Sequence, residues 1–212
     1  MCWSATADLA AGSVVGALGV ACAAGAVRAR RVRDLPLAAL PLLLGVHQLV
    51  EAAVWEGDGG SGTATTVWAV IALPLLAAWV PLAVLSAAPP GARLRLAVPV
   101  AAGSATAAVL AACLAAEAPV AEIRGHTVGY AVDVPNPPLL IAAYLVATVG
   151  ALLLAADRTI RLLGVLTAVG AGICAVLWRM EFVSTWCAFA AVVSVVLLAW
   201  VRRPAAGRPA IA

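Results

Sequence analysis

Long apolar stretches follow one another along nearly the whole chain, and short polar turns separate them. A helix needs roughly 20 apolar residues to cross the hydrocarbon core of a bilayer, and it satisfies its own backbone hydrogen bonds. A membrane β-barrel would instead show shorter segments of alternating hydrophobicity. The pattern therefore predicts an all-α bundle of seven transmembrane helices, at residues 7–27, 35–55, 64–87, 96–116, 137–156, 160–178 and 183–201.

The longest interval between these stretches is residues 117–136, between the fourth and fifth predicted helices. Polar and apolar residues alternate there on both sides of Gly125 and His126, which is typical of a short β-hairpin. We expect this hairpin to lie over the ends of the helices as a lid. The chain is expected to form one transmembrane domain over residues 1–203, followed by a short cytoplasmic tail at 204–212.

Composition supports lipid as the surrounding solvent. Hydrophobic residues make up 65% of the 212 residues, charged residues make up 11%, and the mean hydropathy is +1.07. Soluble domains are roughly 45–50% apolar and about 25% charged. All 13 basic residues are arginine, and Ala, Val, Leu and Gly dominate the rest, which is typical of a GC-rich genome such as that of an actinobacterium.

The arginines predict the orientation of the bundle. Eleven of the 13 fall in turns or a tail that seven helices would place on one side of the membrane: Arg28, Arg30, Arg31, Arg33, Arg93, Arg95, Arg158, Arg161, Arg202, Arg203 and Arg208. The other side holds Arg124 and Arg179. Because cytoplasmic loops carry the excess of basic residues, the N-terminus is predicted outside and the C-terminus in the cytoplasm. Seven helices fit this alternation, whereas six or eight would not.

Two further patterns concern packing. Gly12, Gly16 and Gly19 form a stripe on the first predicted helix, where small residues would allow another helix to approach closely. Five tryptophans lie near predicted helix ends, where they are interpreted as interfacial anchors: Trp55, Trp68, Trp178, Trp186 and Trp200.

Polar side chains within a membrane helix are energetically costly, so they mark candidate functional positions. The second predicted helix contains His47, Glu51 and Trp55 at a spacing of four residues, which places all three on one helix face. This face is expected to point into the bundle, because lipid would not accommodate both His47 and Glu51.

Other polar residues are expected at the same, outer end of the bundle. They come from the start of the chain, the 117–136 loop and the region where the seventh helix begins: Ser4, His126, Tyr130, Glu181, Ser184, Trp186 and Cys187. This one-sided distribution predicts an outward-facing pocket between the first, second and seventh helices, with the 117–136 loop as its roof.

Three segments together resemble a known family. They are Met1-Cys2-Trp3-Ser4-Ala5, the stretch from Leu35 to Glu51, and Ser184-Thr185-Trp186-Cys187-Ala188 with the residues that follow. The set resembles the DUF6629-type family of small actinobacterial membrane proteins, which begin Met-Cys-Phe/Trp-Ser-Ala, and the similarity covers nearly the whole chain. The resemblance implies the polytopic architecture and supports this choice of residues, but it implies no reaction.

The candidate residues leave several kinds of site open. His47 and Glu51 would supply two metal ligands, with Cys187, Cys2 or His126 completing the site, although the chain has only two histidines and no HExxH motif. Cys2 and Cys187 would both lie near the outer face, where a disulfide is possible. The absence of lysine excludes a retinal Schiff base. Quinone or haem binding stays open, although two histidines at different depths do not favour a bis-His haem. The sequence does not identify a cofactor.

The leading functional hypothesis is a membrane protein that binds or senses a small molecule or an ion in the predicted pocket. A second hypothesis is a membrane enzyme, a metal-dependent hydrolase or redox protein, that uses the same pocket. A third is a transporter subunit, which would need a polar path through both halves of the bundle. The lipid bilayer is the expected partner, whereas nucleic acid is not expected, since topology already explains the basic residues.

Overall fold

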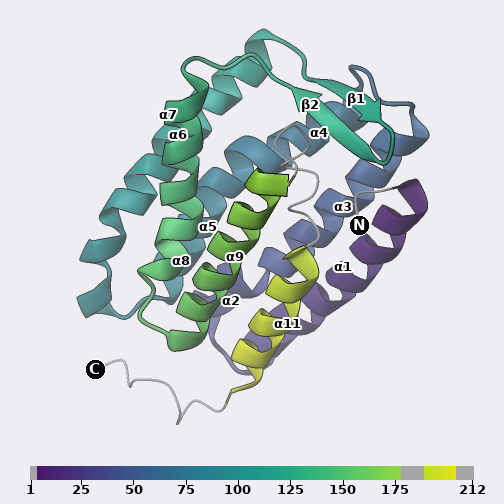
Figure 1. Ribbon diagram of the computed structural model, residues 1–212. Helices are drawn as coiled ribbons and strands as arrows, with labels where there is room; N and C mark the ends of the chain where they lie inside the picture. The colour runs from purple at the N-terminus through teal and green to yellow at the C-terminus, as the bar shows by residue number, and fades with distance from the viewer. Residues whose placement is uncertain (1–3, 178–188, 204–212) are drawn as a thin grey trace.

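The computed structural model describes residues 4–177 and 189–203. These residues form a bundle of helices with a β-hairpin at one end (Figure 1). Several long helical segments are divided by short π-helical or 3-10 turns, and each such composite segment is called a rod below. The elements are α1 (Ala5–Arg28), η1 (Val32–Asp34), α2 (Leu35–Ala38), α3 (Leu40–Glu56), α4 (Thr63–Val70), η2 (Ile71–Leu75), α5 (Leu76–Ala87), η3 (Pro90–Ala92), η4 (Leu94–Leu96), α6 (Ala97–Ala116), β1 (Val120–Arg124), β2 (Thr127–Ala131), α7 (Pro137–Leu145), η5 (Val146–Gly150), α8 (Ala151–Leu153), α9 (Arg158–Leu177) and α11 (Phe189–Arg202).

The helical prediction is confirmed, and the membrane character is supported by length and composition. Within the described part of the chain, four helical segments are long and apolar enough to cross a bilayer: Ala5–Arg28, Val32–Glu56, Thr63–Ala87 and Pro90–Ala116. Pro137–Leu153 and Ala190–Arg202 are shorter apolar helices. The protein thus has the features of a multi-pass membrane protein, while the count of seven crossings stays a prediction.

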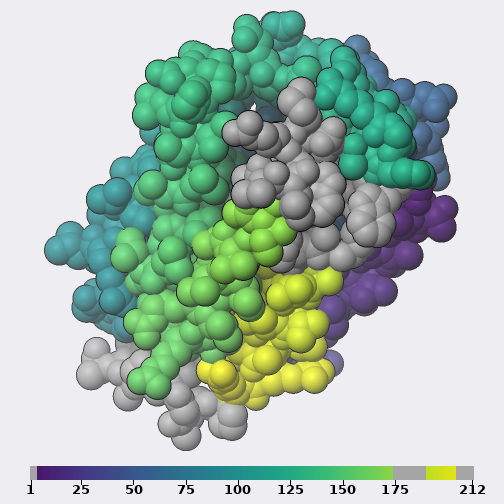
Figure 2. All heavy atoms as spheres, viewed as in Figure 1, coloured from purple at the N-terminus to yellow at the C-terminus, as the bar shows by residue number. Residues whose placement is uncertain are grey.

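The expected hairpin is present between α6 and α7. Strands β1 and β2 are antiparallel, with Arg124 opposite Thr127 at the turn, and Gly125 there adopts a positive φ of 63°. The backbone of Ala121 also exchanges two hydrogen bonds with Gly60, at 2.7 and 3.0 Å, in the connection between α3 and α4. The hairpin is therefore fixed to the end of the bundle, beside that connection (Figure 2).

Helices α1 and α3 pack with almost no space between their backbones, as the glycine stripe predicts. A Cβ atom added at Gly19 would lie 2.2 Å from the Leu42 nitrogen, and one added at Gly45 would lie 2.5 Å from the Gly16 nitrogen. A Cβ atom at Gly12 would lie 3.0 Å from the Gly45 oxygen. Only glycine allows this approach, so the stripe determines how α1 docks on α3.

Two tryptophans differ from the expected role of interfacial anchors. Trp68 in α4 is 1% exposed and Trp200 in α11 is 2% exposed, so both rings pack inside the protein. Trp68 belongs to a cluster with residues of α3 and the hairpin, and Trp200 packs among apolar residues of the opposite end. Hydropathy places a tryptophan at a helix end, but the packing of neighbouring helices decides whether it faces lipid.

Helices α1 and α11 both end at the end of the bundle opposite the hairpin (Figure 1). Each carries an arginine in its last turn, Arg28 and Arg202. The Arg31 guanidinium donates a hydrogen bond to the Val201 carbonyl, lies 5.9 Å from the centre of the Trp200 ring, and pairs with Asp34 at 3.6 Å. These contacts tie the α1–α2 connection to the last described turn of α11 at the same end.

Candidate functional site

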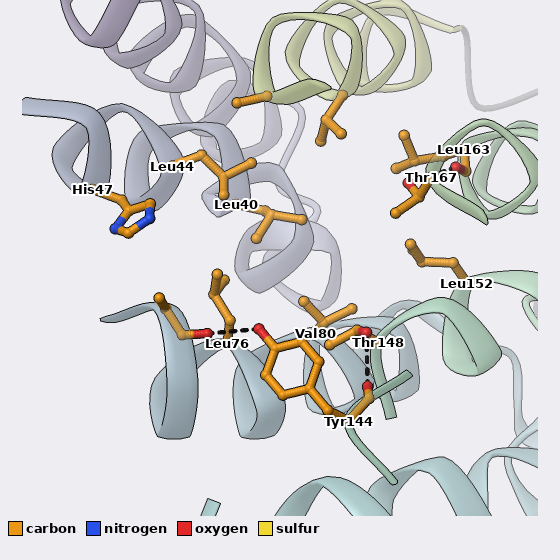
Figure 3. Close-up of a pocket in the computed structure, with 13 residues that line it drawn as sticks. Leu40, Leu44, His47, Leu76, Val80, Tyr144, Thr148, Leu152, Leu163 and Thr167 are labelled. Atoms are coloured by element: carbon orange, nitrogen blue, oxygen red, sulfur yellow. Dashed lines mark hydrogen bonds between the residues drawn. The ribbon is translucent and has the colours of Figure 1, made fainter. Parts of the chain in front are cut away.

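A cavity of about 130 Å³ lies inside the bundle, in the space shown in Figure 3. Segments far apart in the sequence surround it, namely α3, the η2–α5 rod, the α7–η5–α8 rod, α9 and α11. Its lining residues are Leu40, Leu44, His47, Ala72, Leu76, Val80, Tyr144, Thr148, Leu152, Leu163, Thr167, Ala190 and Val193. Most of these side chains are aliphatic, so the cavity offers an apolar space with a few polar groups in its wall.

Both π-helical turns of the described chain contribute to this wall. The turn at η2 contains Pro74, which has no N–H to donate, and the Leu76 N–H bonds to the Ile71 carbonyl five residues before it. The Ala72 carbonyl accepts instead from the Tyr144 hydroxyl at 2.6 Å, as the left dashed line in Figure 3 shows. Irregular turns of this kind are frequent at functional sites.

The hydroxyl groups in the wall donate their protons to backbone carbonyls. Thr148 donates to the Tyr144 carbonyl at 2.8 Å, and Thr167 donates to the Leu163 carbonyl at 2.8 Å. Each bond runs to the residue four positions earlier, which satisfies the threonine proton within its own rod. The threonine oxygens nonetheless keep lone pairs that accept further hydrogen bonds.

His47 connects the cavity to the hairpin. Its side chain lines the cavity and is 3% exposed, and its ring lies 4.9 Å from the Trp68 ring. The Trp68 ring in turn stacks on Tyr130 of β2, with 3.4 Å between centroids and 5° between planes. Among the residues that the structure describes, the buried His47 Nδ1 has no hydrogen-bond partner. A continuous aromatic column thus runs from the cavity wall to the hairpin.

A second group of buried polar residues lies where α1 meets α3. Asp8, Gln48 and Glu51 are all fully buried. The Trp55 Nε1 donates a hydrogen bond to the Asp8 carboxylate at 3.0 Å. Burial of two carboxyl groups in an apolar bundle is costly unless they are hydrogen-bonded. Apolar side chains would pack here at a lower energetic cost, so these acids mark a second candidate functional region.

The remaining site residues that the sequence predicts have other positions in the structure. Ser4 caps α1 by accepting a hydrogen bond from the Ala7 N–H at 3.2 Å, which is a structural role. His126 is exposed at the turn of the hairpin, whereas Tyr130 takes part in the aromatic column. Cys2, Glu181, Ser184, Trp186 and Cys187 lie outside the described residues, and so does the predicted Cys2–Cys187 disulfide.

Two predictions about the site can be compared with the described chain. Among the side chains that the structure describes, at residues 4–173 and 190–203, no three of His, Cys, Asp or Glu group so as to hold a metal. The candidate set that includes Cys187 extends beyond these residues. None of the described lining residues of the cavity comes from α1. The cavity therefore differs from the pocket expected between the first, second and seventh helices, which stays a prediction.

Sequence reasoning missed Tyr144, Thr148 and Thr167 as cavity residues, and it assigned Trp68 to the membrane interface. The spacing of Tyr144 and Thr148, four residues apart in an apolar helix, would have indicated a shared polar face. Asp8, in contrast, is expected from the sequence at the outer end together with Ser4, because it is an acidic residue near the start of the first apolar helix.

Fold and composition together define a helical protein with several apolar helices of membrane-spanning length. The chain belongs to DUF6629, a family of unknown function, whose model matches residues 1–212. This match confirms the resemblance found in the sequence. No curated protein and no solved structure matches the chain.

Proposed function

We propose that this protein binds a small molecule inside its membrane-embedded bundle. The observation that carries the proposal is the cavity of about 130 Å³ between α3, α5, α8, α9 and α11. Ligand sites are typically apolar cavities with a few polar groups that fix orientation, and they occur between the helices of bundles. His47, Thr148 and Thr167 are such groups, placed among leucine, valine and alanine side chains.

The buried His47 gives the second support. An imidazole has two ring nitrogens, each of which is a hydrogen-bonding group. A buried polar atom without a partner costs about 1–3 kcal/mol, so its retention calls for an explanation. A site in which His47 orients a ligand explains why the histidine is retained. A leucine at this position would form a purely structural wall without the cost of an unpaired polar atom.

The test is to fill the cavity and ask whether bound material is lost. Ala190 lines the cavity and is 4% exposed, so Ala190→Leu places three more carbon atoms in its wall. The wild type and this variant would be purified in mild detergent, and bound small molecules would be extracted and compared by mass spectrometry. Ala101→Leu, on an exposed position of α6, is the matched control.

We expect a compound present in stoichiometric amount in the wild type and in Ala101→Leu, and reduced at least fivefold in Ala190→Leu. The same amount in all three proteins, or no retained compound in any of them, would count against the proposed function.

We also propose that the hairpin faces the outside and that the arginine-rich end faces the cytoplasm, across seven helices. The distribution of arginine supports this orientation. In a background without the native cysteines, His126→Cys in intact cells should react with a membrane-impermeant maleimide, and Arg93→Cys should react only after the cells are opened. The reverse pattern would refute the orientation.

A further inference from the structure

The walls of the cavity indicate which chemical class of ligand it accepts. We propose that the cavity takes a molecule of single-ring size with an apolar body and one hydrogen-bond donor, an O–H or N–H group. The inference rests on the proposed function and adds the chemistry of the ligand to it.

Size limits the ligand first. An apolar protein cavity of about 150 Å³ holds benzene, and the cavity here measures about 130 Å³. Because the cavity is only partly enclosed, this volume limits the part of a ligand that lies within it. A six-membered ring with one small substituent is near the upper limit.

The apolar wall sets the second requirement. Leu40, Leu44 and Leu76 border one part of the cavity, and Leu152 and Leu163 border another (Figure 3). A charged or strongly polar ligand would lose its hydration there without compensation. The body of the ligand is therefore hydrocarbon or aromatic.

The hydrogen bonds that the threonine hydroxyls already donate set the third requirement for the ligand. Thr148 and Thr167 already donate to the carbonyls of Tyr144 and Leu163, each at 2.8 Å. A hydroxyl has one proton and two lone pairs, so each threonine still accepts but no longer has a free proton to donate. A ligand that donates finds acceptors in both threonine hydroxyls, whereas a ligand that only accepts must break one of the threonine bonds to use them. The neutral His47 ring in the same wall has one N–H and one lone pair, so it suits either kind of ligand and does not alter this preference.

The experiment compares three fluorinated probes by ¹⁹F NMR on the full chain in phosphatidylcholine nanodiscs, with empty nanodiscs as the background. The probes are 4-fluorophenol, which donates, 4-fluorotoluene, which has the same shape without the hydroxyl, and 4-fluorobenzaldehyde, which only accepts. We expect 4-fluorophenol to bind about five- to tenfold more tightly than either of the others, the ratio that one net hydrogen bond supplies.

Variants then locate the preference. Thr148→Val with Thr167→Val keeps the side-chain shape and removes both acceptors, so it should reduce the preference for 4-fluorophenol to less than twofold. Thr106→Val is the matched control, because Thr106 is a buried threonine of α6 outside the cavity wall, and the preference should persist there. If the double variant fails to fold, the ranking of the three probes on the wild type still decides the proposal.

The outcomes separate the two proposals. Equal binding of all three probes, abolished by Ala190→Leu, would overturn the donor requirement and leave the proposed function standing. No binding above empty nanodiscs would overturn both. An unchanged preference in the double threonine variant would show that these hydroxyls are not the acceptors and would refute the inference as stated.

Discussion

Helix α3 is packed in opposite ways on its two sides. Towards α1, a Cβ atom added at Gly19 would lie 2.2 Å from the Leu42 nitrogen, and one added at Gly45 would lie 2.5 Å from the Gly16 nitrogen. Towards α5, α8, α9 and α11, Leu40, Leu44 and His47 border an open cavity. One helix thus has a sealed side, towards α1, and an open side, towards α5, α8, α9 and α11. Because α3 packs tightly against α1, the cavity results from how the other four helices are arranged and not from loose packing throughout the bundle.

The largest effect on stability is expected from a larger side chain at the tightly packed α1–α3 interface. Gly19→Ala places a Cβ atom 2.2 Å from the Leu42 backbone nitrogen, so α1 and α3 must separate. We expect a loss of about 3 kcal/mol in the free energy of unfolding, at the upper end of typical overpacking costs. Reversible unfolding in mixed detergent micelles measures this loss.

Gly16→Ala is the matched control for that change, because a Cβ atom at Gly16 meets nothing within 4 Å. It should be neutral, or stabilising by up to about 1 kcal/mol from helix propensity. Equal stability of the two variants would show that the glycine stripe does not fix the interface.

The next effect concerns the buried acid on the sealed side. Asp8→Ala removes the acceptor of the Trp55 Nε1 bond and leaves that N–H without it. We expect a loss of about 2 kcal/mol, within the range for a buried donor that loses its partner. Asp133→Ala changes an exposed acid and should stay within about 0.5 kcal/mol of the wild type. A neutral Asp8→Ala would assign the carboxylate a role other than stability.

A smaller and more local effect is expected in the aromatic column. Tyr130→Ala removes the ring that stacks on Trp68 at 3.4 Å, an interaction worth about 1 kcal/mol beyond the buried area. Hydrogen exchange of the amides of β1 and β2 should accelerate by at least about fivefold, because the buried area of the ring is lost together with the stacking, while the exchange of α6 is unchanged. His126→Ala, at the exposed turn, should not alter either rate. Faster exchange in both variants would argue against the column as the attachment.

The smallest change is expected on the open side. Ala190→Leu enlarges a side chain that borders the cavity, so the added atoms occupy existing space. Thermal unfolding in detergent should show a shift of less than about 0.5 kcal/mol in stability, because the filled volume offsets the strain of the larger group. A loss comparable to that of Gly19→Ala would mean that the cavity is not accessible to a side chain at this position.

The sequence predicted the helices well because each is determined along the chain itself. Apolar length, the polar turns and the glycine stripe of α1 depend on neighbouring residues, and the hairpin around Gly125 follows from local alternation and turn chemistry. His47 and Glu51 were identified as buried for the same reason, since a polar group in an apolar helix must face protein.

The cavity could not be predicted in this way. Its wall joins residues as distant as Leu40 and Val193, and its shape depends on how five rods pack side by side. The burial of Trp68 in α4 likewise depends on Tyr130, which comes from strand β2 of the hairpin. The sequence alone thus determined the helical, membrane-compatible class and the polar candidates of α3, because hydropathy and hydrogen bonding act along the chain. The tertiary structure alone decided which side of α3 is sealed and which is open, because packing depends on atoms that come together only in the folded bundle.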